Sequence, residues 1–453
     1  GVLKLQSKVP DGRGERTLHL LSKRLVASIL SVFLAVSAMF AGGGAAAAQE
    51  AVTPPKIDAA AAILMDAETG QVLFEQNADT PLPPASMAKM MTEYLVLKAV
   101  RSGQLSWDQV ITVGENAASQ IGSRIFLARG DKHTVKELYI ATAVGSANDA
   151  SVQLAEAVSG SEEAFVELMN ETARQLGMTN SHFINATGLD RADMPEKFRP
   201  SESAGETEMS ARDAALLAYT ILKEVPEFLE YSSILEYKFR ERDKDPMVNW
   251  NWMLETASVK PAFRQFSYPG VDGLKTGHTS RALNCFTGTA KRGDRRLIAV
   301  VMGVPGNWQE GRRFLETAKL FDYGFIAFET ATIVDAKTVV EGYEEAPVKK
   351  GKSRSVPVVT GSDIVRLMPK GGKTEVTAAE VRFNEQIVAP VSQGDKLGTV
   401  TYTFKDPVTG QTVSETLDLI AARDVPKASW WQLMLRGIGD FFTSLFKGIV
   451  NLF

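Results

Sequence analysis

The segment SMAKMMTEYLVLKAV, residues 86–100, predicts the first helix of the fold. Its apolar residues recur at intervals of three and four, which is the spacing of an amphipathic helix. Two prolines, Pro83 and Pro84, stand just before it, and proline is favoured at helix starts because its missing N–H is not needed there. The helix is therefore expected to begin at Ser86, with Ser86 and Lys89 on the same face.

Strand patterns occur on both sides of this helix. Residues 60–77, AAAILMDAETGQVLFEQN, predict a hairpin that turns at Glu68-Thr69-Gly70, and residues 286–304 predict a second hairpin. Four further stretches have helical periodicity: VKELYIATAV, NDASVQLAEAV, EEAFVELMNETARQLG and ARDAALLAYTILKEV. Strands at both ends of a helical centre predict an α+β domain, over residues 49–328, whose antiparallel sheet joins the two ends of the segment.

The remainder of the chain has a different texture. Residues 329–426 consist of short alternating runs, such as GTVTYTF and QTVSETLDLI, separated by Gly, Pro and Asp, which predicts a small all-β domain that serves as a spacer or docking surface. In residues 427–453 the polar positions fall within a narrow arc of a helix. We expect an amphipathic helix lying in the membrane surface; a helix packed on the protein's own surface is the alternative.

The N-terminal segment has the pattern of a secretory signal. Residues 25–40 form an uncharged apolar run that follows two basic residues and precedes Ala46-Ala47-Ala48. We expect cleavage before Gln49, so that residues 1–48 are an N-terminal extension and signal peptide. The alternative is an uncleaved membrane anchor, although a spanning helix needs about 20 strongly apolar residues. Either way, the rest of the chain is expected outside the cytoplasm.

The composition argues against several classes of function. Residues 1–48 carry six Lys and Arg against two acidic residues, so the rest of the chain has a net charge of −8 within an overall charge of −4. An acidic body lacks the clustered cations that phosphate binding requires, and we expect no nucleic-acid partner. The four histidines have no metal-site spacing and Cys285 is the only cysteine, so neither a disulfide nor a metal or other cofactor is predicted.

Three short motifs occur in one order within the α+β segment. They are Ser86-Met87-Ala88-Lys89, Ser146-Ala147-Asn148 and Lys275-Thr276-Gly277. Each motif alone is a weak signal that would also fit a helix surface or a turn. Together, in this order and spacing, they are typical of β-lactamases and penicillin-binding proteins, in which a serine is acylated.

The residue types of the first two motifs fit nucleophilic catalysis. A serine hydroxyl is a poor nucleophile until a base takes its proton. Lys89 is the predicted base if burial and a second cation, Lys275, lower its pKa. Ser146 could relay a proton to the leaving amine, and Asn148 could present its amide to the substrate. Helix capping is the alternative role of this second motif.

The third motif is predicted to lie on an edge strand beside the nucleophile. Gly277 leaves room for the substrate backbone, while Lys275 and Thr276 offer a cation and a hydroxyl to a terminal carboxylate. The side chain of His278 is a weaker candidate for the base. Its backbone N–H is expected to form an oxyanion hole with that of Ser86.

These residues resemble the low-molecular-mass penicillin-binding proteins that are serine-type D-alanyl-D-alanine carboxypeptidases. The similarity runs from about Ala59 to Phe325 and includes LMDAETGQVL, PASMAK, SANDAS, FINATGLD, VDGLKTGHT and RFLETAKLFDYGF. It implies removal of the terminal D-alanine from peptidoglycan stem pentapeptides through a Ser86 acyl-enzyme, and covalent inhibition by β-lactams. It also implies that Arg313 lies on the substrate-carboxylate side of the site.

The same resemblance implies a location for the protein. In that family a β-rich stalk and a tail helix hold the catalytic domain at the outer, periplasmic face of the cytoplasmic membrane. Some positions depart from the family pattern: Ala147 replaces a usual glycine, Ala88 a common threonine, and Leu283 a residue that is typically small. Leu283 is expected to affect substrate preference more than activity.

Two other functions remain open from the sequence. A serine β-lactamase shares the three motifs, but neither Glu196 nor Glu227 stands in the setting of the glutamate that activates water for deacylation in class A enzymes. A non-catalytic envelope protein that binds peptidoglycan is the second alternative. It is disfavoured because a binding module has no use for an activated serine.

Overall fold

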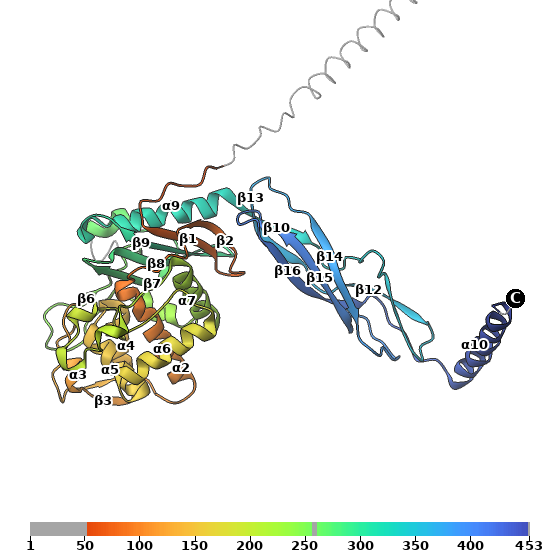
Figure 1. The fold of residues 1–453 in the computed structure, drawn as a ribbon, viewed down its shortest axis with the longest axis horizontal. Helices are drawn as coiled ribbons and strands as arrows, with labels where there is room; N and C mark the ends of the chain where they lie inside the picture. The colour runs from red at the N-terminus through yellow and green to blue at the C-terminus, as the bar shows by residue number, and fades with distance from the viewer. Residues whose placement is uncertain (1–51, 256–260, 452–453) are drawn as a thin grey trace, which may run out of the picture. The chain divides into compact units, whose positions relative to one another are not determined.

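The computed structural model describes residues 52–255 and 261–451 of the chain (Figure 1). The predicted signal segment, residues 1–48, lies outside the described residues. Within them, an α+β region is followed by a β-rich region and a C-terminal helix, and the predicted fold class is confirmed.

A five-stranded antiparallel sheet joins the two ends of the α+β region. Its strands, in spatial order, are β2 (Val72–Gln76), β1 (Ala61–Asp66), β9 (Arg295–Val304), β8 (Leu283–Arg292) and β7 (Val271–Thr279). Strand β1 pairs with β9, with Ile63 opposite Val300, although more than 200 residues separate them in sequence. Both predicted hairpins are therefore confirmed, and β7 forms one edge of the sheet.

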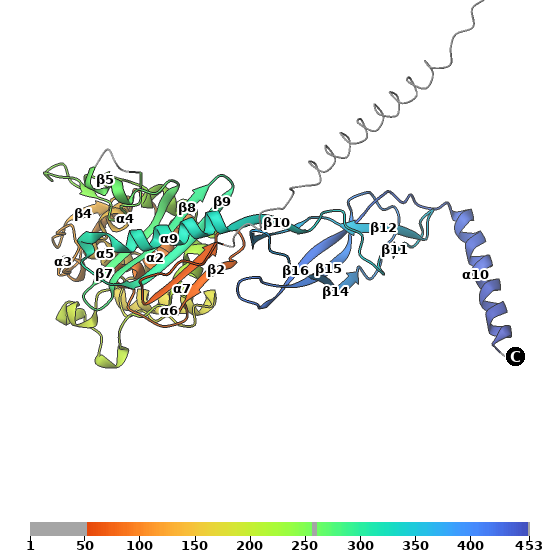
Figure 2. The same ribbon diagram turned by 90° about the horizontal axis from the view of Figure 1, so that it is seen from above.

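Helices cover both faces of this sheet (Figures 1 and 2). One face carries α2 (Lys89–Arg101), α4 (Val135–Gly145), α5 (Asn148–Ser159), α6 (Glu162–Leu176), α7 (Ala211–Glu224) and α8 (Phe228–Ser232), and the other carries α9 (Arg312–Ala327). Successive strand residues point to opposite faces, so β1 contributes to two cores. Ile63 packs with the helices of the first face, whereas Leu64 packs with Phe321 of α9.

Short elements complete the α+β region around these layers. They are β3 (Val110–Thr112), α3 (Glu115–Ala118), β4 (Lys132–Thr134), β5 (Glu236–Tyr237), β6 (Met247–Val248) and the 3-10 turns η1 (Ala85–Ala88), η2 (Arg191–Asp193), η3 (Glu196–Phe198), η4 (Glu202–Ala204), η5 (Pro261–Phe266) and η6 (Trp308–Glu310).

The β-rich region contains two sheets. β10 (Phe328–Val334) pairs with β13 (Ile364–Pro369), and a five-stranded sheet has the order β11 (Glu345–Pro347), β12 (Ser355–Thr360), β16 (Thr412–Ala421), β15 (Lys396–Lys405), β14 (Val376–Phe383). The buried side chains of β12, Val356 and Val358, alternate with partly exposed ones, as expected for a half-buried strand.

The chain ends in a helix with an uncovered apolar face. α10 (Trp430–Val450) has no buried residue, and its large apolar side chains, apart from the partly buried Leu433, are about half to three-quarters exposed, from 48% at Ile438 to 75% at Trp430. Its polar side chains contact the preceding β-rich region: Arg436 donates to the carbonyl oxygen of Gly351 over 2.7 Å, and Asp440 pairs with Arg354 at 2.9 Å. Within the described part of the chain, no helix has the length and apolar character to cross a membrane.

Candidate active site

Ser86 and Lys89 meet at the start of α2. Ser86 lies in η1, a 3-10 turn, and Lys89 is the first residue of α2. Lys89 Nζ donates to Ser86 Oγ over 2.8 Å. Lys89 is fully buried, whereas Ser86 is partly exposed. The sequence predicted that Ser86 lies in the first turn of an α-helix. The structure has a tighter 3-10 turn here, but Ser86 and Lys89, three residues apart, are still in contact as expected.

Ser146 joins two lysines that are far apart in sequence. Its Oγ accepts hydrogen bonds from Lys89 Nζ at 3.2 Å and from Lys275 Nζ at 3.0 Å. Ser146 ends α4 in a left-handed conformation, with φ of 56°, which is uncommon for a residue other than glycine. This turn between α4 and α5 directs the hydroxyl to the point between the two ammonium groups.

Asn148 binds the same lysine rather than capping a helix. Its Oδ1 accepts from Lys89 Nζ at 2.7 Å, and its Nδ2 donates to the carbonyl oxygen of Ile121 at 2.7 Å. The N-cap of α5 is Ala147, and no side chain caps that helix end. The side chains of Ser146 and Asn148 therefore bind lysines, and neither of them caps the start of α5.

The edge strand β7 runs directly against η1, the turn that contains Ser86. A Cβ atom on Gly277 would lie 2.5 Å from the carbonyl oxygen of Pro84 and 3.1 Å from the nitrogen of Ser86, so only glycine fits here. Arg313 Nη1 donates to the carbonyl oxygen of Gly277 over 3.0 Å. The ring Nδ1 of His278 lies 3.1 Å from Asn284 Oδ1.

A cavity of about 230 Å³ opens above these groups. It is lined by Ser86, Ser123, Ser146, Trp250, Thr276, Gly277, His278, Trp308 and Arg313. Of the nine predicted site residues, three do not line it: Lys89, Asn148 and Lys275. Lys89 and Lys275 contact the lining hydroxyls of Ser86 and Ser146, and Asn148 is connected to them through Lys89.

Burial and mutual repulsion lower the pKa values of the cationic groups. Burial, and then the positive charge of Lys275, hold the pKa of Lys89 well below its usual range. Burial lowers the pKa of Lys275 to about 8 and that of Arg313 to about 10. A lysine with a depressed pKa can be neutral near physiological pH, which is the form that can accept a proton from a serine.

Comparison with known proteins agrees with this geometry. A family model described as D-alanyl-D-alanine carboxypeptidase matches residues 48–306, and one described as Penicillin-binding protein 5, C-terminal domain, matches residues 328–427. The D-alanyl-D-alanine carboxypeptidase DacF of Bacillus subtilis is 35% identical over 85% of this chain and 90% of its own length. The chain belongs to the D-alanyl-D-alanine carboxypeptidase family. It is a serine-type carboxypeptidase and a hydrolase.

Solved structures resemble most of the carboxypeptidase or a smaller part of it. A peptidoglycan synthesis regulatory factor, PBP3, from Streptococcus pneumoniae has a TM-score of 0.69 and 30% identity, covering 82% of this chain and 100% of that one. Penicillin-binding protein D2 from Listeria monocytogenes in its ampicillin-bound form has a TM-score of 0.50 and 31% identity, covering 60% of this chain and 100% of that one.

Two residues near the candidate site were not among the predicted site residues. A Cβ atom on Gly188, in the FINATGLD stretch, would lie 1.9 Å from the carbonyl oxygen of Ala85, beside Ser86. The buried carboxylate of Asp149 accepts from the backbone nitrogens of Ile125 and Leu127 at 3.1 and 3.0 Å. In the sequence, Gly188 is visible as the glycine of FINATGLD and Asp149 as the acidic residue of SANDAS. Neither motif predicts the distant segment that the residue contacts in the structure.

Two features near the third motif were also noted in the sequence. Cys285 is buried in β8, and burial raises the pKa of its thiol to about 11, so it is poorly suited to nucleophilic chemistry. Leu283, the departure from the family pattern, has a left-handed φ of 59° and is 39% exposed at the beginning of β8. It does not line the cavity.

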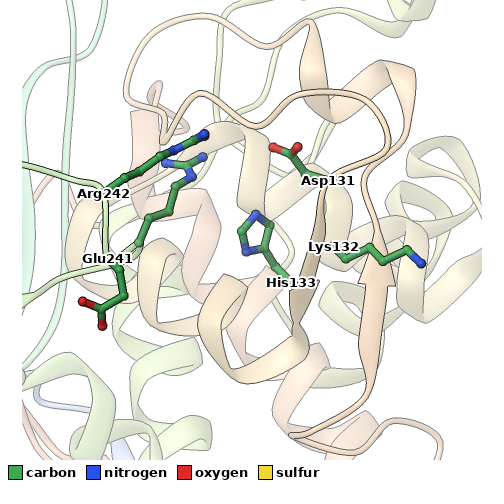
Figure 3. Close-up of a pocket in the computed structure, with 6 residues that line it drawn as sticks. Asp131, Lys132, His133, Glu241 and Arg242 are labelled. Carbon is green, nitrogen blue, oxygen red and sulfur yellow. The ribbon is translucent and has the colours of Figure 1, made fainter.

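The carboxypeptidase has a second pocket, of about 380 Å³, on another part of its surface (Figure 3). Two segments line it: Asp131 with Lys132 and His133 of β4, and Arg240, Glu241 and Arg242 from a loop. Arg240 donates to the carbonyl oxygen of Ile125 over 2.6 Å, and His133 lies 3.3 Å from Glu137. None of the predicted site residues belongs to this pocket.

Proposed function

We propose that this enzyme removes the terminal D-alanine of peptidoglycan stem pentapeptides through an acyl-enzyme on Ser86. The observation that carries the proposal is the chain of contacts from Ser86 through Lys89 to Ser146 and Lys275. Neutral Lys89 accepts the proton of Ser86 as Oγ attacks the carbonyl carbon of the penultimate D-alanine. Its depressed pKa supports this role.

The remaining groups are assigned by their positions around the attacking oxygen. The backbone N–H groups of Ser86 and His278 stabilise the oxyanion. Ser146 passes the proton from Lys89 to the departing nitrogen as the C–N bond breaks. The hydroxyl of Thr276 and the cation of Arg313 hold the terminal carboxylate, because both line the cavity. Water then cleaves the ester and restores Ser86, with release of the shortened peptide.

Lys275 and Asn148 have supporting roles in the proposal. Lys275 holds Ser146 in place and supplies positive charge on the carboxylate side, since it reaches Ser146 from β7. Asn148 orients Lys89, and Gly277 lets the substrate backbone approach β7. The substrate would lie along this edge strand and extend the sheet.

Labelled penicillin tests the nucleophile and separates the enzyme from a β-lactamase. The ampicillin-bound Listeria relative supports reaction with β-lactams here as well. We expect a long-lived adduct on Ser86 and release of D-alanine from a peptide ending in D-Ala-D-Ala, both absent in Ser86→Ala. Rapid penicillin turnover would identify a β-lactamase instead. If the wild type released no D-alanine and Ser86→Ala behaved like the wild type, the enzyme proposal would fail. Non-catalytic binding of peptidoglycan would then be the remaining function.

The proposal also includes peripheral attachment to the outer face of the cytoplasmic membrane through residues 427–453. The apolar side chains of α10 are exposed, while Arg436 and Asp440 on its polar side contact the chain's own residues. That arrangement supports a helix lying in the membrane surface, because its apolar face is left for lipid. Packing of the apolar face on the protein itself has no support in these contacts.

A further inference from the structure

Two tryptophans that the proposed mechanism does not use form one side of the active-site cavity. Trp250 and Trp308 both line it, and their ring centroids lie 5.4 Å apart at an interplanar angle of 73°. They are 58 positions apart in the chain and come from a loop after β6 and from η6. We call this pair the tryptophan wall.

The tryptophan wall is held rigidly from behind. Trp250 Nε1 donates to the carbonyl oxygen of Gly145 over 3.3 Å. Trp252, which is buried, lies 6.3 Å from Trp308 and stacks on Phe263 at 4.2 Å, with the rings 11° from parallel. It also lies 5.4 Å from Phe314, the neighbour of Arg313. An aromatic surface packed in this way cannot easily move aside for a bulky ligand.

The anchors of the wall show which part of the substrate it borders. Trp250 is fixed to Gly145, which directly precedes Ser146, the group assigned to the departing nitrogen. Behind the wall, Trp252 contacts Phe314, which follows Arg313, the group assigned to the terminal carboxylate. Both connections lie on the side of the residue that leaves, rather than on the side of the part that acylates Ser86.

We propose that the tryptophan wall restricts the departing residue to D-alanine or another small D-amino acid, and so makes the enzyme a carboxypeptidase that rejects cross-linked peptides. This rests on the proposed function. In a cross-link the departing nitrogen belongs to a second stem peptide, so a long chain replaces the methyl group of D-alanine. A pocket discriminates by about 10- to 200-fold for each methylene that it must accept or reject. A rigid wall therefore excludes a long side chain strongly.

The test compares departing residues of different size on the full chain. The substrates are acetylated tripeptides ending in D-Ala-D-Ala or D-Ala-D-Leu, and a purified cross-linked muropeptide dimer. For the wild type we expect kcat/KM to fall at least about 100-fold from D-Ala to D-Leu. Trp308→Ala and Trp250→Ala should each reduce this ratio at least about tenfold and increase cleavage of the dimer.

Matched controls keep the result interpretable. Trp430→Ala removes an exposed tryptophan of α10 and should leave the ratio unchanged, and Trp308→Phe should retain most of it. Penicillin labelling of Ser86 counts the folded active sites in each variant. An unchanged ratio of D-Ala to D-Leu release in both Trp→Ala variants overturns the proposal. Failure of the wild type to release any D-alanine would refute the proposed function instead.

Discussion

Glu93 lies one helical turn beyond Lys89 on α2, and both side chains are fully buried. Among the residues that the structure describes, no group donates a hydrogen bond to either carboxylate oxygen of Glu93. Burial raises the pKa of Glu93 to about 8, and the charges of Lys275 and Lys89 act in the opposite direction. The hydroxyl of Tyr139, on α4, is buried nearby and likewise unpartnered.

Replacement of Glu93 should shift the pH dependence of acylation. Ionised Glu93 raises the pKa of Lys89, and Asp149 on α5 does the same. Glu93 carries this charge above its pKa of about 8, and in Glu93→Gln the charge is lost, so Lys89 becomes neutral at lower pH in that range. We expect the acid limb of the rate of penicillin acylation, followed from about pH 5 to pH 10, to move to lower pH. A limb that stays in place would show that Glu93 does not act on Lys89.

Replacement of Lys275 should shift the same limb in the opposite direction. Its positive charge lowers the pKa of Lys89, so Lys275→Gln should raise that pKa and move the acid limb of penicillin acylation to higher pH. The maximal rate should also fall, because Lys275 holds Ser146 at 3.0 Å. Shifts of the same sign in the Glu93 and Lys275 variants would contradict an electrostatic coupling among these three groups.

Removal of the hydroxyl between the lysines should slow the chemistry without unfolding the site. Ser146→Ala keeps a Cβ in the same left-handed backbone position, so the change removes only the group that contacts Lys89 and Lys275. Loss of a proton relay typically costs about 10²- to 10⁴-fold. We expect kcat for D-alanine release to fall within that range, with a smaller change in KM. A kcat within about threefold of the wild type would exclude the relay.

Gly188 should tolerate no side chain. At a φ of +84°, a Cβ would meet the carbonyl oxygen of Ala85 at 1.9 Å. Gly188→Ala should cost about 1–2 kcal/mol for the left-handed conformation and about 1–3 kcal/mol for overpacking. Urea unfolding measures the loss, and penicillin labelling should also decline because the clash reaches the turn that contains Ser86.

A second glycine provides the control for Gly188. Gly177 has nearly the same φ, +82°, but nothing lies within 4 Å of its Cβ position. Gly177→Ala should therefore lose only the conformational part, about 1–2 kcal/mol, and retain full labelling. Equal losses in the two variants would mean that the contact with Ala85 relaxes without cost.

Acidic substitutions should distinguish the two sides of α10. Phe446 is 69% exposed on the apolar side, and its transfer into lipid is worth about 1.5–3 kcal/mol. Phe446→Asp should weaken binding of the protein to phosphatidylglycerol-containing vesicles by at least about tenfold in a flotation assay. The matched variant Thr443→Asp changes the polar side and should have a much smaller effect. Equal effects of the two changes would argue against an in-plane helix.

Local patterns predicted most of the secondary structure and the order of the motifs. The helix at residues 86–100, the hairpin at residues 60–77 and the later helices follow from apolar periods of 3.6 and 2, which each segment carries on its own. Strands β11 (Glu345–Pro347) and β12 (Ser355–Thr360) are harder to predict from local patterns, because both contain proline, which is uncommon within strands.

By itself, the sequence predicted Ser86 as the nucleophile, Lys89 as its base and the two partner motifs, since these predictions follow from residue type and spacing. Only the tertiary structure brought Ser146 between Lys89 and Lys275, 57 and 129 residues away in the chain. It also decided that Glu93 is buried without a partner and that Trp250 and Trp308 meet at the cavity. The physical reason is that such contacts join distant segments across packed layers, and burial and desolvation, which shift pKa values, are properties of the assembled core.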